Sequence, residues 1–267
     1  MPHDVIDLGE IACLVRMFEI CKTVESIFPP GCIITLVTDG VIYHELFGAT
    51  FQEAINFRTS LEKLISQMNI SDRVRIIDMI NLVNRFGSEF DLLKDKIAEE
   101  LKSPELAHKM TNLQKGVAPN LNLTETPLEI LFHLFNSNPD NIPENLQNDF
   151  SFWREDIATR SRKTAIGYAS TLLAIKKLQI IEKIFPRAIR ATVHPKPGQL
   201  GLFLVNNGSA LGSYHGIPLL KKSNGKNINL KNLKIRYELD VRSRQNVRPV
   251  FLKGQNFPLF WEEHNSS

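Results

Sequence analysis

The sequence has little of what marks several large classes of protein. Glycine and proline number only 14 each among 267 residues, which excludes collagen-like and low-complexity chains. Apolar residues make up 43% and charged residues 23%, so the chain does not belong to the disordered class. Its longest apolar candidate, Tyr168 to Ile175, ends at two lysines, so we expect no transmembrane helix and no membrane partner.

Cysteine is also scarce and shows no motif. Cys13, Cys21 and Cys32 are odd in number and lack Cys-x-x-Cys spacing, so we interpret them as small buried side chains of a protein from a reducing compartment. The segment Met1–Asp4 lacks the basic start and apolar run of a signal peptide. A cytoplasmic location is expected.

Charge is distributed unevenly along the chain. Residues 1–154 hold 13 basic and 22 acidic side chains, a net charge of −9, whereas residues 155–267 hold 19 and 7, a net charge of +12. A basic half favours an anionic partner, either a nucleic acid or a small phosphate. The Lys and Arg residues are spread over a helix start and several loops without a nucleic-acid-binding motif, so the small phosphate is the favoured interpretation.

The first part of the chain alternates between helical and strand patterns. Apolar spacing predicts helices over residues 10–28, 50–68 and 88–101. The short, nearly all-apolar stretch at 32–37 predicts a strand buried on both faces, the kind found in parallel sheets, and the stretch at 74–79 predicts a second strand. This order indicates an α/β fold, a Rossmann-like layered sheet with flanking helices, and leaves room for a smaller C-terminal subdomain.

The rest of the chain gives a weaker pattern. We expect a loop over 111–127. Short helices are predicted at 127–135 and 144–153, a long helix at 156–185, and strands at 189–193, 201–205, 235–239 and 250–252. The predicted organisation is an α/β part (1–110), loops with short helices (111–155), and a helix with mixed strands (156–267).

Three cations stand at the predicted start of the long helix. Arg160, Arg162 and Lys163 alternate with hydroxyl residues there, at the end where the helix dipole is already positive. Cations and free backbone N–H groups together bind phosphate. The alternative is a solvated basic face paired with Glu155 and Asp156.

Two histidines follow predicted strands or lie in turns. His194 and Lys196 come directly after the strand at 189–193, where ligand crevices form in open α/β sheets. His215 follows Tyr214 between turn residues. Each histidine could act as a general base, or could simply belong to a rigid turn.

A third strand end carries a carboxylate. Asp39 lies between Thr38 and Gly40 after the strand at 32–37, where it could bind an amine or a hydroxyl, or cap the next turn. His44 and Glu45 follow closely. The sequence contains no Gly-x-Gly-x-x-Gly, Walker, His-Glu-x-x-His or Cys-x-x-Cys motif, so a metal site is not expected.

Four ordered blocks resemble the pyoverdine/dityrosine biosynthesis family, whose known members include isocyanide (isonitrile) synthases. Residues 30–48 resemble its Pro-Gly, strand and Ser-Asp-Gly block, residues 189–201 its "IRLSIHPQP" block, residues 214–219 its "PWHGV" block, and residues 247–263 its "GRPYYFRE" ending. Thr38 stands where the family usually has Ser. Family members usually carry a further N-terminal segment before the first block, so a diverged, inactive paralogue or scaffold is an alternative expectation.

The resemblance implies a definite reaction. The α-amine of tyrosine or tryptophan condenses with ribulose 5-phosphate, and one sugar carbon remains on nitrogen as an isocyanide, without any metal or organic cofactor. An iron- and 2-oxoglutarate-dependent oxygenase is the pathway partner that the resemblance suggests. For catalysis we assign His194, His215 and Asp39. For phosphate binding we assign Arg160, Arg162, Lys163 and Lys196. For other substrate contacts we assign Thr38, Gly40, Glu45 and Tyr214.

Overall fold

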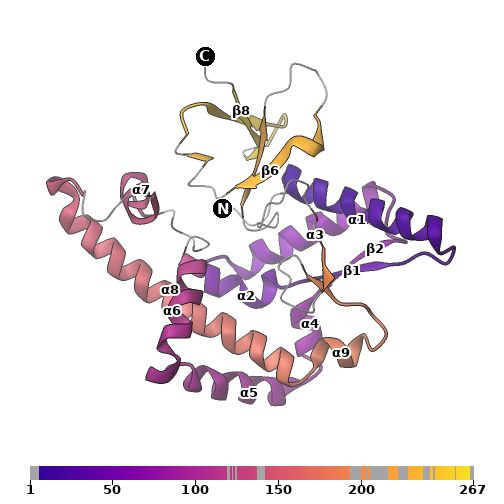
Figure 1. The fold of residues 1–267 in the computed structure, drawn as a ribbon, viewed down its shortest axis with the longest axis horizontal. Coiled ribbons are helices and arrows are strands. Elements are labelled where there is room, and N and C mark those ends of the chain that lie inside the picture. The colour runs from indigo at the N-terminus through magenta and orange to yellow at the C-terminus, as the bar shows by residue number, and fades with distance from the viewer. Residues whose placement is uncertain are drawn as a thin grey trace. The chain divides into compact units, whose positions relative to one another are not determined.

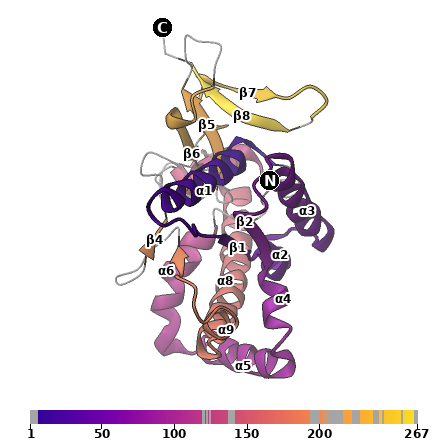
Figure 2. The ribbon, with the colours of Figure 1, turned by 90° about the vertical axis from the view of Figure 1, so that its right-hand side faces the viewer.

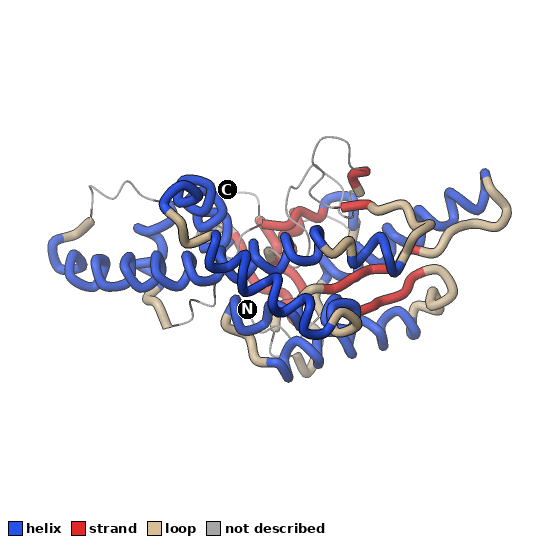
Figure 3. The backbone as a smooth tube through the Cα atoms, turned by 90° about the horizontal axis from the view of Figure 1, so that it is seen from below, coloured by secondary structure: helices blue, strands red, loops and turns tan. Residues whose placement is uncertain are grey.

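The computed structural model groups the chain into two compact units. It describes residues 6–118, 121, 123, 125–136, 142–192, 200–202, 204, 216–221, 228–236, 241–242, 244–255 and 257–264. Residues 38–54 and 78–188 form one unit, here called the helical unit, and the described parts of 2–37, 55–77 and 189–267 form the other, the sheet unit. Helices make up most of the described chain, and the strands are short (Figure 3).

The helical unit is organised around one long helix. Its described helices are α2 (Gly40–Phe47), α4 (Met79–Val83), α5 (Gly87–Glu100), α6 (Ala107–Val117), α7 (Leu128–Asn136), α8 (Gln147–Lys177) and α9 (Ile180–Ile184), with 3₁₀ turns η1 (Pro104–Leu106) and η4 (Glu144–Leu146). Helices α2, α5, α6 and α7 pack on α8 (Figure 1). Phe90 and Ile97 of α5, and Met110 and Val117 of α6, are buried at a seven-residue spacing, which places each pair on one helix face.

The sheet unit contains the strands. Its elements are α1 (Leu8–Ile27), β1 (Ile34–Thr38), most of α3 (Phe51–Gln67), β2 (Val74–Asp78), β3 (Ala191–Thr192), β4 (Leu200–Gly201), β5 (Ile217–Lys221), η6 (Leu230–Asn232), β6 (Leu233–Arg236), β7 (Val247–Phe251) and β8 (Pro258–Glu263). The described strands pair as β1-β2, as the parallel pair β3-β4, and as a four-stranded sheet in the order β6-β5-β8-β7. Within that last sheet β5 and β8 are parallel, with Leu219 opposite Trp261, and the other pairs are antiparallel.

Helix α1 packs against this four-stranded sheet, as Figure 2 shows. Leu14 and Met17 of α1 share a buried apolar cluster with Leu61 of α3, Ile235 of β6 and Phe260 of β8. A capping box fixes the start of α1. The carboxylate of the N-cap residue Asp7 accepts the backbone N–H of Gly9, and the Glu10 carboxylate accepts the backbone N–H of Asp7.

The structure confirms an α/β chain and most of the elements predicted for its first part. The helices expected at 10–28, 50–68 and 88–101 are α1, α3 and α5, and the two expected strands are β1 and β2. Strand β1 is half-buried along its length and is not buried on both faces as expected. Among the described residues, no helix is both long and apolar enough to cross a membrane.

Two further local predictions are wrong, and two strands were missed. Helix α8 begins at Gln147 and not at 156, because the buried face continues backward through Phe150, while the exposed Phe152 hides that periodicity. Helix α6 occupies part of the segment 111–127, which was expected to be a loop. The prediction failed because the helix has only two buried apolar residues, seven positions apart, and so small a number gives no clear helical pattern in the sequence. Strands β5 and β8 were not predicted.

Candidate active site

The site forms where β1 and β2 end. The backbone N of Ile34 donates to the carbonyl of Arg73 over 2.9 Å, and the hydroxyl of Thr38 donates to Oδ1 of Asp78 over 2.7 Å. The two contacts follow the same order along both strands, so the strands are parallel and their carboxyl ends meet. Ligands of open α/β sheets bind outside such ends.

Each strand is followed at once by a helix whose N-cap residue is an aspartate. Asp78, the N-cap of α4, is 2% exposed and accepts the Thr38 hydrogen bond. Asp39, the N-cap of α2, is exposed, and its side chain makes no capping hydrogen bond. Of the two roles left open for Asp39, side-chain capping is therefore excluded, and its carboxylate stays available to another group.

The surroundings of Asp39 alter its acidity. Desolvation by neighbouring protein atoms raises the pKa of the Asp39 carboxyl, although water reaches part of its surface. A carboxyl in such a place gives up its proton less readily than one on an open surface. A cation bound next to this carboxylate would stabilise its negative charge in place of the water that the protein excludes.

Two tyrosines complete the arrangement. The rings of Tyr43 on α2 and Tyr168 on α8 lie 4.9 Å apart, centroid to centroid, tilted by 48°. Burial raises the pKa of both phenols, and the negative charge of Asp39 raises each further, so the carboxylate lies near both rings. Tyr43 is 3% exposed, and within the described residues its hydroxyl has no hydrogen-bond partner. A buried hydroxyl without a partner is a binding group that a ligand can satisfy.

Contacts between α2 and α8 hold the two tyrosines together. The hydroxyl of Thr164, one turn before Tyr168, donates to the backbone carbonyl of Leu46 over 2.7 Å. Gly167 allows the helices to approach closely, because a Cβ there would come within 2.8 Å of the Leu46 side chain. Helix α2 then ends at Gly48, whose φ of 77° is the left-handed conformation that glycine accepts readily.

The three predicted phosphate-binding cations on α8 lie well inside the helix and not at its N-terminus. The free backbone N–H groups of a helix start therefore do not help them to bind phosphate. Arg160 is half-buried and forms an ion pair with Asp156 at 3.4 Å, eight residues before Tyr168 on the face that meets α2. Arg162 and Lys163 are exposed, and Arg162 projects about 200° around the helix from Arg160. The structure therefore does not bring Arg160 and Arg162 together.

The other predicted residues divide in two groups. Gly40 is the exposed first residue of α2, and Glu45 lies on the solvent side of that helix with its side chain 87% exposed. His44 Nδ1 lies 2.7 Å from the Val41 carbonyl within the same helix. A second group, predicted as catalytic or substrate-binding, lies outside the described residues: His194, Lys196, Tyr214 and His215.

Sequence reasoning missed Asp78, Tyr43 and Tyr168. Asp78 ends a strand whose pattern Arg75 interrupts, and the tyrosines stand at apolar helix positions that are typical of an ordinary core. In the described part of the chain no group of three or more His, Cys, Asp or Glu residues could hold a metal ion. The arrangement offers a carboxylate for a cation or a proton beside a pair of aromatic rings.

Two parallel strands each end at an aspartate at the start of a helix. This arrangement is that of an α/β protein whose candidate site lies at the carboxyl ends of its strands. Residues 3–228 match the model of the pyoverdine/dityrosine biosynthesis protein family, so the chain belongs to that family.

Individual relatives are more distant. The chain is 22% identical over 229 residues to an L-tryptophan isonitrile synthase of Fischerella ambigua, a match that covers 82% of this chain and 64% of that enzyme. It is 19% identical over 265 residues to an L-tyrosine isonitrile synthase of Xenorhabdus nematophila, covering 91% and 75%. Its fold is similar to the crystal structure of PvcA from Pseudomonas aeruginosa, with a TM-score of 0.65 and 18% identity over 98% of this chain and 79% of that one.

Proposed function

We propose that this protein is an isonitrile synthase of secondary metabolism. In this proposal it converts the α-amine of L-tryptophan or L-tyrosine to an isocyanide, with ribulose 5-phosphate as the carbon donor. The names of the two relatives support isonitrile formation and the aromatic amino acid substrate. The observation that carries it is the Asp39 carboxylate at the end of the half-buried strand β1, whose charge acts on the paired rings of Tyr43 and Tyr168.

An aromatic amino acid has two parts that suit this arrangement. Its ammonium group is a cation that would restore the solvation lost by the Asp39 carboxylate. Its ring would stack on the exposed part of Tyr168, since aromatic rings favour tilted or offset contacts of the kind that Tyr168 already makes with Tyr43. A tyrosine or tryptophan substrate also has a polar group that could pair with the Tyr43 hydroxyl.

Asp39 is also the proposed base. An amine attacks a ketone only after it loses a proton, and a carboxylate with a raised pKa accepts that proton more readily than an ordinary one. Thr38 and Gly40 flank Asp39 and remain proposed substrate contacts. The roles of His194, His215 and Tyr214 in the later proton transfers also remain proposals from the sequence.

For the sugar phosphate we favour Arg160 among the α8 cations. It lies about 12 Å along the helix axis from Tyr168 and about 80° around the helix from it, whereas Arg162 lies about 120° around. The guanidinium binds phosphate through two parallel hydrogen bonds, a geometry that Lys cannot reproduce. Lys196 remains a proposed second cation. Arg162 and Lys163 would act at most through their charge.

The direct test uses the purified protein with ribulose 5-phosphate and either L-tryptophan or L-tyrosine. Mass spectrometry should detect an isocyanide product with at least one amino acid, and ¹³C placed at C2 of the sugar phosphate should appear in that product. Folded protein that makes no isocyanide from either amino acid would favour the inactive paralogue. A control without sugar phosphate should give no product.

A further inference from the structure

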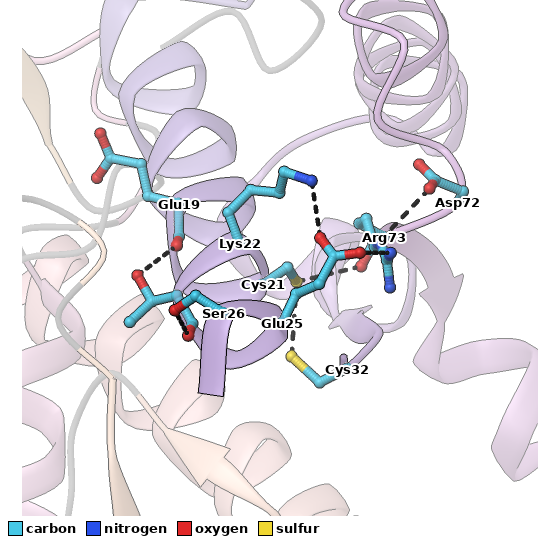
Figure 4. Close-up of polar contacts among 9 residues, drawn as sticks. Glu19, Cys21, Lys22, Glu25, Ser26, Cys32, Asp72 and Arg73 are labelled. Carbon is cyan, nitrogen blue, oxygen red and sulfur yellow. Dashed lines mark hydrogen bonds and ion pairs between the residues drawn. The ribbon is translucent and has the colours of Figure 1, made fainter. Parts of the chain in front are cut away.

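Two of the three cysteines lie close together in the sheet unit, away from the candidate site. Cys21 is on the last turns of α1 and is completely buried, and Cys32 is in the segment that leads into β1. Their sulfur atoms are 3.7 Å apart, and Figure 4 shows them facing one another. The two thiols are free of any disulfide.

The segment that joins the two cysteines is held by neighbouring polar groups. The Arg73 guanidinium binds Glu25, which also accepts a hydrogen bond from Lys22 at 2.7 Å (Figure 4). The turn contains Gly31 at φ 69°, where a Cβ would meet the Arg73 side chain at 2.7 Å. This network fixes the end of α1 and the turn after it against Arg73, the residue before β2, and so keeps the two thiols in proximity.

The two thiols differ in exposure. Cys21 donates to the Arg73 carbonyl over 3.6 Å, and burial raises the pKa of its thiol to about 11, so it remains protonated. Cys32 is partly exposed, which makes it the thiol that a small oxidant reaches first. An accessible thiol beside a buried one is the arrangement of an attacking and a resolving cysteine.

We propose that Cys21 and Cys32 form a redox modification site, at which hydrogen peroxide converts the two thiols to a reversible intramolecular disulfide. The sulfur atoms must approach by about 1.7 Å to reach the disulfide bond length.

The reaction has two steps. The Cys32 thiol loses its proton, and the thiolate attacks one peroxide oxygen as the O–O bond breaks. Cys32 becomes a sulfenic acid, and the second oxygen leaves as hydroxide, which takes up the released proton and becomes water. Cys21 then gives its proton to the sulfenic acid oxygen as its sulfur attacks the Cys32 sulfur, the S–O bond breaks, and the oxygen leaves as a second water. Two thiols and one peroxide thus give one disulfide and two waters, and a dithiol reductant reverses the change.

Intact-mass and peptide mass spectrometry after peroxide treatment and thiol alkylation test the proposal. Wild-type protein and the matched control Cys13→Ser should each lose two hydrogens and yield a single peptide pair linked through Cys21 and Cys32. Cys32→Ser should stay reduced. Cys21→Ala should stop at a sulfenic acid on Cys32, which a dimedone adduct detects.

Thermal unfolding of the wild type gives a second measurement that needs no variant. The disulfide closes a short loop, so oxidation should raise Tm by about 5 °C, and dithiothreitol should reverse the rise. Full alkylation of both thiols after peroxide treatment would overturn the proposal, as would a disulfide that includes Cys13 or joins two chains. None of these results depends on isonitrile formation, so the two proposals fail separately.

Discussion

The ends of β1 and β2 are built alike but are used differently. Each strand is followed at once by a helix, and each helix has an aspartate as its N-cap. Neither side chain caps its helix. Asp78 is buried and accepts a short hydrogen bond from Thr38, whereas Asp39 is exposed and has a raised pKa. The Asp78 carboxylate therefore joins the two strands. The Asp39 carboxylate does not cap its helix, and its charge acts on the paired rings of Tyr43 and Tyr168.

The difference indicates how to separate structure from chemistry at this site. A carboxylate that protein groups already satisfy contributes to stability, and its removal leaves a buried donor without an acceptor. A carboxylate that is desolvated without such partners costs stability and is retained for function. Asp78 and Asp39 should therefore respond in opposite ways to substitution.

The largest effect expected is on activity at Asp39. Asp39→Ala should lower kcat/KM for the amino acid by 10²-fold or more, because the proposed base and the ammonium partner are both lost. Isonitrile formation is measured by mass spectrometry. The matched control is Asp95→Asn on the exposed face of α5, which should retain full activity. An Asp39→Ala protein with wild-type kcat/KM would refute the assignment.

The next effect is on stability at Asp78. Asp78→Ala should lower the free energy of unfolding by about 2–3 kcal/mol, because the Thr38 hydroxyl loses its acceptor. Asp78→Asn keeps an acceptor oxygen and should lose about half as much. Chemical denaturation measures both. If the alanine variant were as stable as wild type, the Thr38 hydrogen bond would not join the strands.

The comparison also shows what the sequence could predict. Residues 32–37 are apolar and β-branched and end in a turn, so both β1 and Asp39 could be located. Arg75 interrupts the corresponding pattern in β2, and Asp78 was missed for that reason. The histidines predicted at 194 and 215 lie outside the described residues.

The tyrosine pair could not be predicted for a different reason. Tyr43 and Tyr168 meet only because α2 packs on α8. The spacing of residues within one helix cannot predict a contact between two residues so far apart in sequence. The long helix shows a related limit. Its buried stripe is broken by the exposed Phe152, so its start, and with it the position of Arg160, was misjudged.

A smaller effect is expected where the aromatic pair meets substrate. Tyr168→Ala should raise KM for the amino acid by about tenfold through the lost ring contact, with a smaller change in kcat. Tyr168→Phe keeps the ring and is the matched control. Equal KM values for the two variants would show that the ring does not contact substrate.

The smallest effect concerns the pH dependence of stability at Asp39. The pKa of Asp39 is raised in the folded protein, so the folded state holds this proton more tightly than the unfolded state does. Its contribution to stability is therefore full below the ordinary carboxyl pKa of about 4, and is lost as pH rises through the folded-state pKa. Asp39→Asn removes the charge but keeps the shape of the side chain, so its Tm should exceed that of wild type at pH 7 by a few degrees, and the gain should vanish near pH 4. Asp95→Asn should show no such trend. A variant less stable than wild type at pH 7 would mean that Asp39 is satisfied by protein groups, as Asp78 is, and the contrast between the two strand ends would disappear.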